Sequence, residues 1–169
     1  MIRKVAFGKA MAAGALGALA WEAVARAALA LGWIRFDLIF LLGTLIAGPG
    51  DPRLWYPAGL AMHLLIGALW GLIYAYFFWA LLPWPPVLQG LAFSLIPGVL
   101  AITAMLPQLD ELHPLIAQGS LRAPGFLALG YGWEGPVGSL LGHLIYGAAL
   151  GALYTRPVGH PVRKELAYG

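Results

Sequence analysis

The chain has 169 residues, of which 61% are hydrophobic and only 10% are charged, and its mean hydropathy is +0.81. Soluble domains carry about a quarter charged residues, so this composition excludes a soluble globular domain and a disordered chain. The net charge of +3 comes without a basic stripe interleaved with aromatic residues, which excludes a nucleic-acid-binding protein. The chain has no cysteine, so disulfides and thiolate chemistry are excluded as well.

Four apolar runs each have about the length of a membrane-spanning helix. They cover approximately residues 5–31, 57–82, 87–106 and 136–154. Pro97 and Gly98 lie in the middle of the third run and predict a kink there. The sequence therefore predicts an all-α, polytopic membrane protein with a single membrane domain over residues 1–169, in which residues 158–169 form a cytoplasmic tail.

Between the first two runs, residues 38–48 are apolar but cover only about half a span. They follow Arg35 and Asp37, two charged residues that suit the membrane surface better than its interior. We expect a short interfacial or re-entrant helix at this place. The alternative is a fifth span over about residues 28–48, which would bury both charges in the bilayer at a high cost in free energy.

The distribution of basic residues predicts the orientation. With four spans, the two chain ends share one side of the membrane, which then has six basic residues and one acidic residue, a balance of +5. The other side has four basic and six acidic residues, a balance of −2, and the two values add to the net +3. The positive-inside rule therefore places both termini in the cytoplasm. The first run also resembles a signal peptide, with small residues at 18–20, but its apolar pattern continues beyond them, and we expect an uncleaved anchor.

One pattern occurs twice in the chain, at an offset of 80 residues. The matched pairs are His63 and His143, Gly67 and Gly147, Gly71 and Gly151, and Tyr74 and Tyr154. The spacing of the four positions puts them on one face of a helix. The simplest architecture has two parallel helix-pair repeats, about residues 1–82 and 87–157, related by an axis along the membrane normal. Small residues four apart are typical of close helix packing. The glycines that we expect at helix contacts are Gly67, Gly71, Gly138, Gly142, Gly147 and Gly151.

The polar residues inside the apolar runs form the candidate site. His63 and His143 lie six or seven residues into their runs, which places both imidazoles ~10 Å below the non-cytoplasmic surface of the membrane. Arg26 falls at a similar depth on the antiparallel first run, and Glu22, one turn deeper, has the spacing of an ion-pair partner. Thr103, near the end of the third run, completes this predicted polar layer. Ionisable residues within a membrane are costly and indicate a functional site.

Three interpretations of the polar layer remain open. In the first, Glu22, Arg26 and the two histidines satisfy one another as a structural network. In the second, His63 and His143 are the axial ligands of a tetrapyrrole, most simply haem b, and Arg26 meets a propionate. In the third, the layer binds a substrate, a quinone or a proton beneath the connector 108–134. The sequence contains no recognisable catalytic set, phosphate-binding loop or zinc-protease motif.

The two His-x-x-x-Gly-x-x-x-Gly-x-x-Tyr stripes and the segment from Trp21 and Glu22 to Arg26 resemble an uncharacterised family of small bacterial four-helix inner-membrane proteins. The resemblance implies the fold and a bacterial inner membrane, and it implies no activity. We therefore expect a non-catalytic accessory or cofactor-holding subunit of a larger membrane complex, in contact with lipid and with other membrane subunits or copies of itself. A small carrier or channel-like protein and a purely structural membrane protein are the alternatives.

Overall fold

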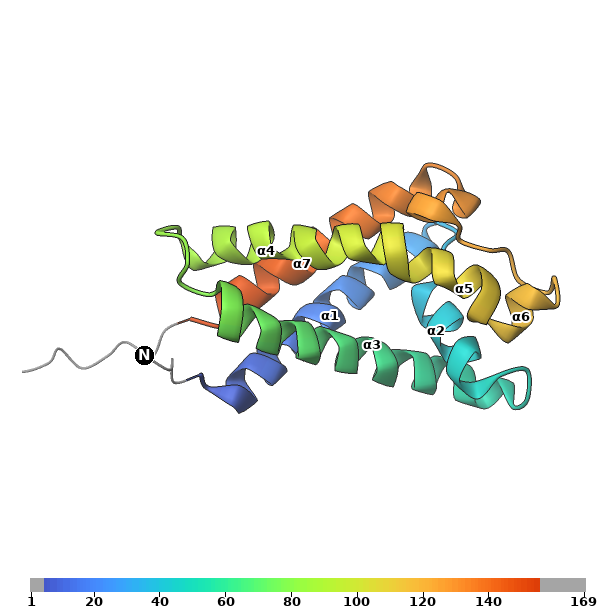
Figure 1. Ribbon diagram of the computed structural model, residues 1–169. Coiled ribbons are helices and arrows are strands. Elements are labelled where there is room, and N and C mark those ends of the chain that lie inside the picture. Colours follow the sequence, from blue (N-terminus) through green and yellow to red (C-terminus); the bar gives the residue numbers. More distant parts are fainter. Residues whose placement is uncertain (1–4, 156–169) are drawn as a thin grey trace, which may run out of the picture.

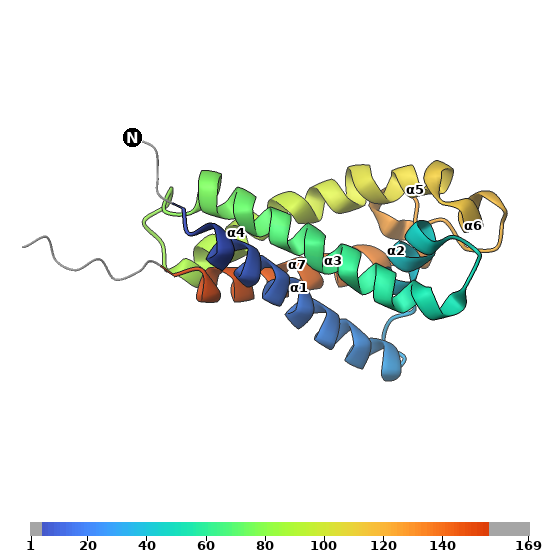
Figure 2. The ribbon, with the colours of Figure 1, turned by 90° about the horizontal axis from the view of Figure 1, so that it is seen from below.

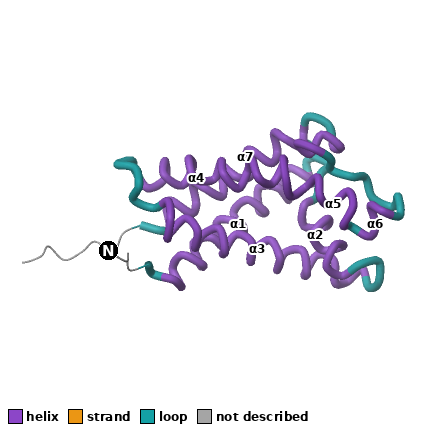
Figure 3. The backbone as a smooth tube through the Cα atoms, in the orientation of Figure 1, coloured by secondary structure: helices purple, strands orange, loops and turns teal. Residues whose placement is uncertain are grey.

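The computed structural model describes residues 5–155, and the regular elements in this range are all helical (Figures 1 and 3). Within it, four stretches are long and apolar enough to cross a membrane: Phe7–Ala30, Pro52–Phe78, Pro86–Leu112 and Glu134–Leu153. The predicted all-α fold with four candidate spans is confirmed, and four such stretches indicate a multi-pass membrane protein. The predicted tail 158–169 and the basic residues near the C-terminus lie outside the described residues.

The four stretches differ in their internal structure. The first is a single helix, α1 (Phe7–Ala30), and the last is α7 (Glu134–Leu153). The second begins with a 3₁₀ turn (Pro52–Leu54), continues as α3 (Trp55–Ile73) and ends in a π-helical turn (Tyr74–Phe78). The third consists of α4 (Pro86–Leu100), a π-helical turn (Ala101–Met105) and α5 (Leu106–Leu112). Pro97 lies inside α4, and the π-helical turn follows it after a few residues, so the irregularity predicted for this run takes the form of a widened turn.

The helices pack in two close pairs. Gly14 of α1 lies against the backbone of Gly67 and Gly71 of α3, where a Cβ atom would collide with main-chain atoms. The equivalent contact between α4 and α7 is formed by Gly90, Gly147 and Gly151. The start of α1 and the end of α7 lie at the same end of the bundle, as Figure 1 shows. We call this the inner end and the opposite end the outer end.

A third contact joins the two pairs through α1 and α7. A Cβ atom at Gly17 of α1 would meet the ring of Tyr146, and the Tyr146 hydroxyl donates a 2.8 Å hydrogen bond to the carbonyl oxygen of Gly67. The bundle therefore has the order α3, α1, α7, α4, and α3 and α4 have hardly any direct backbone contact.

Aromatic side chains fill the space between α3 and α4 at the inner end. Tyr74 and Phe93 are fully buried, with ring centroids 5.2 Å apart, and Trp70 and Tyr154 pack on them from either side at 6.0 and 6.1 Å. The apolar area that these rings bury stabilises the inner half of the bundle. Among the described residues, no comparable aromatic cluster lies between α3 and α4 in the outer half.

A short helix, α2 (Leu38–Ala47), packs beside the start of α3 at the outer end. Its Gly43 lies against the backbone of Trp55, and Gly59 of α3 lies against the backbone of Ile39, so α2 runs antiparallel to α3. Figures 1 and 2 show that α1 diverges from α3 toward this end. At 10 residues α2 is too short to span a bilayer, in agreement with the short helix expected between the first two spans.

The connector between the third and fourth candidate spans forms a cap at the outer end, with α6 (Pro114–Ala117) and a 3₁₀ segment (Phe126–Tyr131) next to the end of α5. His113 fastens this cap to α2 and is fully buried. Its Nδ1 accepts a hydrogen bond from the backbone N–H of Leu115, at 3.2 Å. In a neutral ring, Nε2 then carries the proton and donates to the carbonyl oxygen of Leu41, at 3.1 Å, beside the hydroxyl of Thr44.

Candidate functional site

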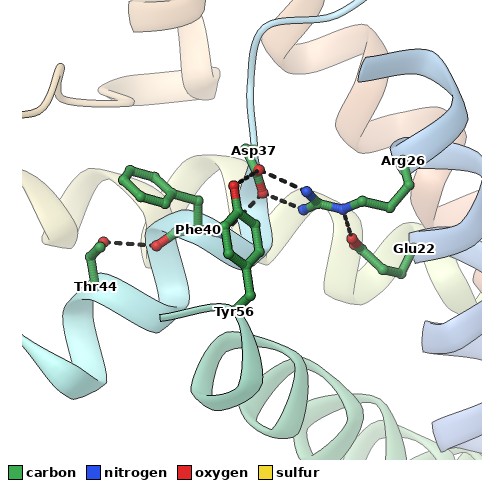
Figure 4. A network of polar contacts seen from close by, with 6 residues as sticks. All are labelled: Glu22, Arg26, Asp37, Phe40, Thr44 and Tyr56. Atoms are coloured by element: carbon green, nitrogen blue, oxygen red, sulfur yellow. Dashed lines mark hydrogen bonds and ion pairs between the residues drawn. The ribbon is translucent and has the colours of Figure 1, made fainter. Parts of the chain in front are cut away.

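A polar network joins α1, α2 and α3 around the guanidinium of Arg26 (Figure 4). Arg26 donates through Nε to Glu22, one turn earlier on α1, and this is the ion pair that their spacing predicts. Its two other nitrogens donate to both carboxylate oxygens of Asp37, one of them at 2.8 Å. The Tyr56 hydroxyl of α3 donates to Asp37 at 3.1 Å, and the Arg26 guanidinium lies 5.2 Å from the centre of the Tyr56 ring.

Asp37 has a structural task within this network. Its carboxylate accepts the backbone N–H of Phe40 at 2.9 Å and so caps the first turn of α2. Burial by itself would raise the pKa of Asp37. The hydrogen bonds from Arg26, from Phe40 and from the Tyr56 hydroxyl outweigh that effect and hold the pKa below its ordinary value of 3.8. The network therefore fixes the start of α2 against α1 and α3.

The two histidines lie outside this network, on either side of an indole. The ring of Trp21 is 5.0 Å from the imidazole of His63 and 4.5 Å from that of His143, between centroids. Within residues 5–155, no hydrogen bond connects either histidine to Glu22 or Arg26. The structure thus brings the four residues into the same outer half of the bundle but divides them into an ionic cluster and an imidazole–indole cluster.

A cavity of about 170 Å³ lies beside His63. We call it the His63 cavity. Helices α1, α2, α3, α4, α5 and α7 all contribute to its wall, which is almost entirely apolar. Its lining includes Trp21, Leu42, Met62, Ile66, Met105, Leu109, His143 and Tyr146. The side chain of His63 is 4% exposed, and its Nδ1 has no hydrogen-bond partner in the described part of the chain.

A second cavity, of about 150 Å³, lies between the outer halves of α1 and α7. We call it the Glu22 cavity, because the buried side chain of Glu22 is in its wall together with Arg26, Glu134 and Ser139. Trp21 and His143 belong to the walls of both cavities, so these two rings separate the His63 cavity from the Glu22 cavity.

The predicted haem arrangement does not fit this site. A porphyrin has four pyrrole rings, whereas each cavity has the volume of about one small ring. Trp21 lies against both imidazoles, and the Nδ1 of His143 is already bonded to the carbonyl oxygen of Ser139 at 2.8 Å. In residues 5–155, no group of three histidine, aspartate or glutamate side chains is placed to hold a metal ion.

The remaining predicted residues divide into those at helix contacts and those elsewhere. A Cβ atom would meet neighbouring atoms at Gly67, Gly71, Gly142, Gly147 and Gly151. At Gly138 it would meet nothing within 4 Å, because this residue borders the Glu22 cavity. Its prediction as a contact glycine is wrong. Thr103 also stands apart from the polar groups, since its hydroxyl donates to the carbonyl oxygen of Val99 within the π-helical turn, at 2.7 Å.

Sequence reasoning missed the partners that matter most at this site. The sequence presents Asp37 as a charge beside an apolar run, and it indicates no role for Tyr56 or Trp21 at the site. A signal for Asp37 was available, because an acidic residue directly before an apolar run is a typical helix N-cap. No comparable signal in the sequence identifies Trp21 as the neighbour of both histidines.

The comparisons with known proteins identify a family and nothing more specific. No curated protein and no solved structure matches the chain. The model of a family of unknown function (DUF6789) matches residues 5–165, nearly the whole length. The described part of the chain carries four candidate membrane spans, and the chain is a member of this family of unknown function.

Proposed function

We propose that this protein binds a lipid-soluble ligand with a single six-membered ring in the His63 cavity. The observation that carries the proposal is the side chain of His63, which lines an otherwise apolar cavity and whose buried Nδ1 has no hydrogen-bond partner among the described residues. A buried polar atom without a partner costs about 1–3 kcal/mol. A ligand that hydrogen-bonds to the imidazole of His63 gives the cavity its specificity.

The volume of the cavity supports a ligand of one ring. An apolar cavity of about 150 Å³ is large enough to hold benzene, and the His63 cavity has about 170 Å³. A neutral imidazole offers one donor and one acceptor, so His63 suits a ring that carries a carbonyl or a hydroxyl group. The head group of a quinone is such a ring, and its carbonyl oxygens accept hydrogen bonds.

The position of the cavity supports entry from the bilayer. Leu42 of α2 and Leu109 of α5 are part of its wall on the side of the outer cap. The flanks are formed by α3, with Ile66, and by α4 and the following turn, with Ala101 and Met105. Residues of α3 and α4 line the cavity on two sides, so we place the entry of a lipid-soluble ligand between the outer halves of these two helices.

Binding is tested with the purified protein in detergent and two probes that share one carbon skeleton. Thymoquinone carries two carbonyl oxygens, and p-cymene has none. Thermal unfolding is followed by circular dichroism at increasing probe concentration, because a ligand that binds the folded state raises the unfolding temperature. We expect saturable stabilisation by both probes, with tighter binding of thymoquinone.

A substitution of His63 tests whether its hydrogen bond, rather than the shape of the cavity, determines the preference between the two probes. The variant His63→Phe keeps a ring against Trp21 and removes both nitrogens, so we expect the preference for thymoquinone over p-cymene to fall about 10-fold. Met105→Leu alters the same wall with nearly unchanged volume and should leave the preference as it is. Absence of saturable stabilisation of the wild type by either probe would refute the proposal. An unchanged preference in His63→Phe would refute the role of His63.

We further infer that the chain is a duplicated helix pair with cytoplasmic termini. The duplication is supported by matched contacts, because Gly14 meets α3 as Gly90 meets α7. The histidines also have matched surroundings, since Trp21 of α1 lies on His63 and Gly98 of α4 lies on His143. The orientation rests on the charge balance of the two ends. In a bacterial inner membrane it places the His63 cavity in the periplasmic half.

A further inference from the structure

The second histidine of the site has a defined tautomer, unlike the first. The Nδ1 of His143 lies 2.8 Å from the backbone carbonyl oxygen of Ser139, one turn earlier on α7. A carbonyl oxygen can only accept, so Nδ1 carries the proton and donates it. In a neutral ring, Nε2 of His143 is therefore unprotonated and acts only as an acceptor.

This acceptor is confined and has no donor. His143 is 6% exposed, and its ring is held between the indole of Trp21, at 4.5 Å, and the backbone at Gly98. Within the described part of the chain, Nε2 of His143 receives no hydrogen bond. The ring belongs to the walls of both cavities, and a ligand in the His63 cavity can supply the missing donor.

We propose that the His63 cavity selects rings that carry a hydroxyl group, a phenol or a quinol, because such a group can donate a hydrogen bond to Nε2 of His143. This inference rests on the proposed function and adds the chemical class of the ligand. A quinone or an ether of the same skeleton has only acceptors, and one of these would face the lone pair of Nε2. His63 adapts to either class, since neither of its nitrogens is fixed by a backbone group, whereas His143 does not. Discrimination between the classes is therefore assigned to His143.

The test compares thymol, thymol methyl ether and p-cymene on the full-length protein in detergent. The first two differ by one methyl group on the oxygen, and the third lacks the oxygen. Dissociation constants come from the ligand dependence of thermal unfolding, as for thymoquinone. We expect thymol to bind about 10-fold more tightly than its methyl ether, because a site built to accept a hydrogen bond rejects an analogue without the donor.

The variant His143→Phe removes the acceptor and keeps a ring beside Trp21. In this variant thymol should lose its advantage over the ether, while p-cymene binds as before. Should the variant fail to fold, nitrogen chemical shifts of His143 in the wild type provide the second measurement. They should report a protonated Nδ1 and a bare Nε2, with a shift of the Nε2 signal on addition of thymol but not of its ether.

The outcomes separate this inference from the proposed function. If p-cymene and thymoquinone bind and thymol shows no preference over its ether, the hydroxyl selectivity is wrong and the cavity remains a ligand site. If thymol is preferred equally in the wild type and in His143→Phe, His143 is not the selecting residue. If none of the compounds stabilises the protein saturably, both proposals are wrong.

Discussion

The contact between α4 and α7 gives the sharpest test of the packing, because the chain contains its own control. At Gly90 of α4, a Cβ atom would lie 2.8 Å from the backbone nitrogen of Gly151 and 2.9 Å from its Cα, and closer still to the carbonyl oxygen of Gly147. An ordinary contact begins at 3.4 Å. The helices must therefore separate by at least about 0.6 Å, since backbone atoms cannot rotate away as a side chain does.

The free-energy change of Gly90→Ala follows from two opposing terms. Forcing a methyl group into a packed contact costs about 1–3 kcal/mol. Alanine in place of glycine inside a helix stabilises the folded state by about 0.5–1 kcal/mol. The net change is a loss of stability of about 1–2 kcal/mol. The matched variant Gly138→Ala puts the same methyl group on α7, where nothing lies within 4 Å, so it keeps only the favourable helix term.

The assay is thermal unfolding of both variants in the same detergent. The difference in free energy of unfolding between them should be about 2 kcal/mol, which for a chain of this size corresponds to a separation of about 5 °C in unfolding temperature. Gly138→Ala should unfold at or above the temperature of the wild type. Equal unfolding temperatures for the two variants would refute the close approach of α4 and α7.

Three further predictions concern other parts of the chain. The pKa of Asp37 is lowered in the folded state, so its carboxylate stabilises the fold at pH values above its ordinary pKa, and this contribution is lost as the pH falls through the folded value. Below about pH 4, the unfolding temperature of the wild type should therefore fall more steeply with pH than that of Asp37→Asn. Parallel curves for the two proteins would contradict this. Tyr146→Phe should lower the free energy of unfolding in a denaturant titration by about 0.6 kcal/mol, because the bond to the Gly67 carbonyl is lost; no change would mean that this bond is not formed. A C-terminal alkaline phosphatase fusion should be inactive and a fluorescent protein fusion bright, and the opposite result would overturn the orientation.

Hydropathy predicts the four long apolar stretches of this fold, although the second begins at residue 52 rather than 57 and the third continues to residue 112 rather than 106. The ends of the first and last spans, Phe7–Ala30 and Glu134–Leu153, lie within about two residues of the expected positions, because long apolar runs have few alternative structures in a membrane. The spacing of Glu22 and Arg26 similarly predicted their ion pair, since neighbours on one helix face need no tertiary information.

The arrangement around the site was less predictable for a geometric reason. Depth can be counted along a helix, which is why His63 and His143 were expected at one level. The direction in which each side chain points depends on rotation of the helices about their axes, and the sequence leaves this open, so the indole of Trp21 against both imidazoles was not foreseen. The same applies to Gly138, where a small-residue pattern does not say which face meets a partner.

The contact between Asp37 and Arg26 could not be predicted from the sequence either. The two residues are separated by the end of α1 and a reversal of the chain, and hydropathy carries no information on the direction of such a segment. The structure resolves the apparent misfit, because Asp37 enters the bundle with a cationic partner and as the cap of α2.

The placement of Glu22 one turn before Arg26 has a consequence for how the protein reaches the membrane. The first span α1 is synthesised before α2, and an arginine without a counterion is costly within a membrane helix. Here the counterion arrives on the same helix, four residues earlier, so the segment enters as an electrically neutral unit. Asp37 is translated only afterwards and adds a second carboxylate to a guanidinium that already has one. The charge of Arg26 is therefore already compensated within α1, and the docking of α2 is not needed for that purpose.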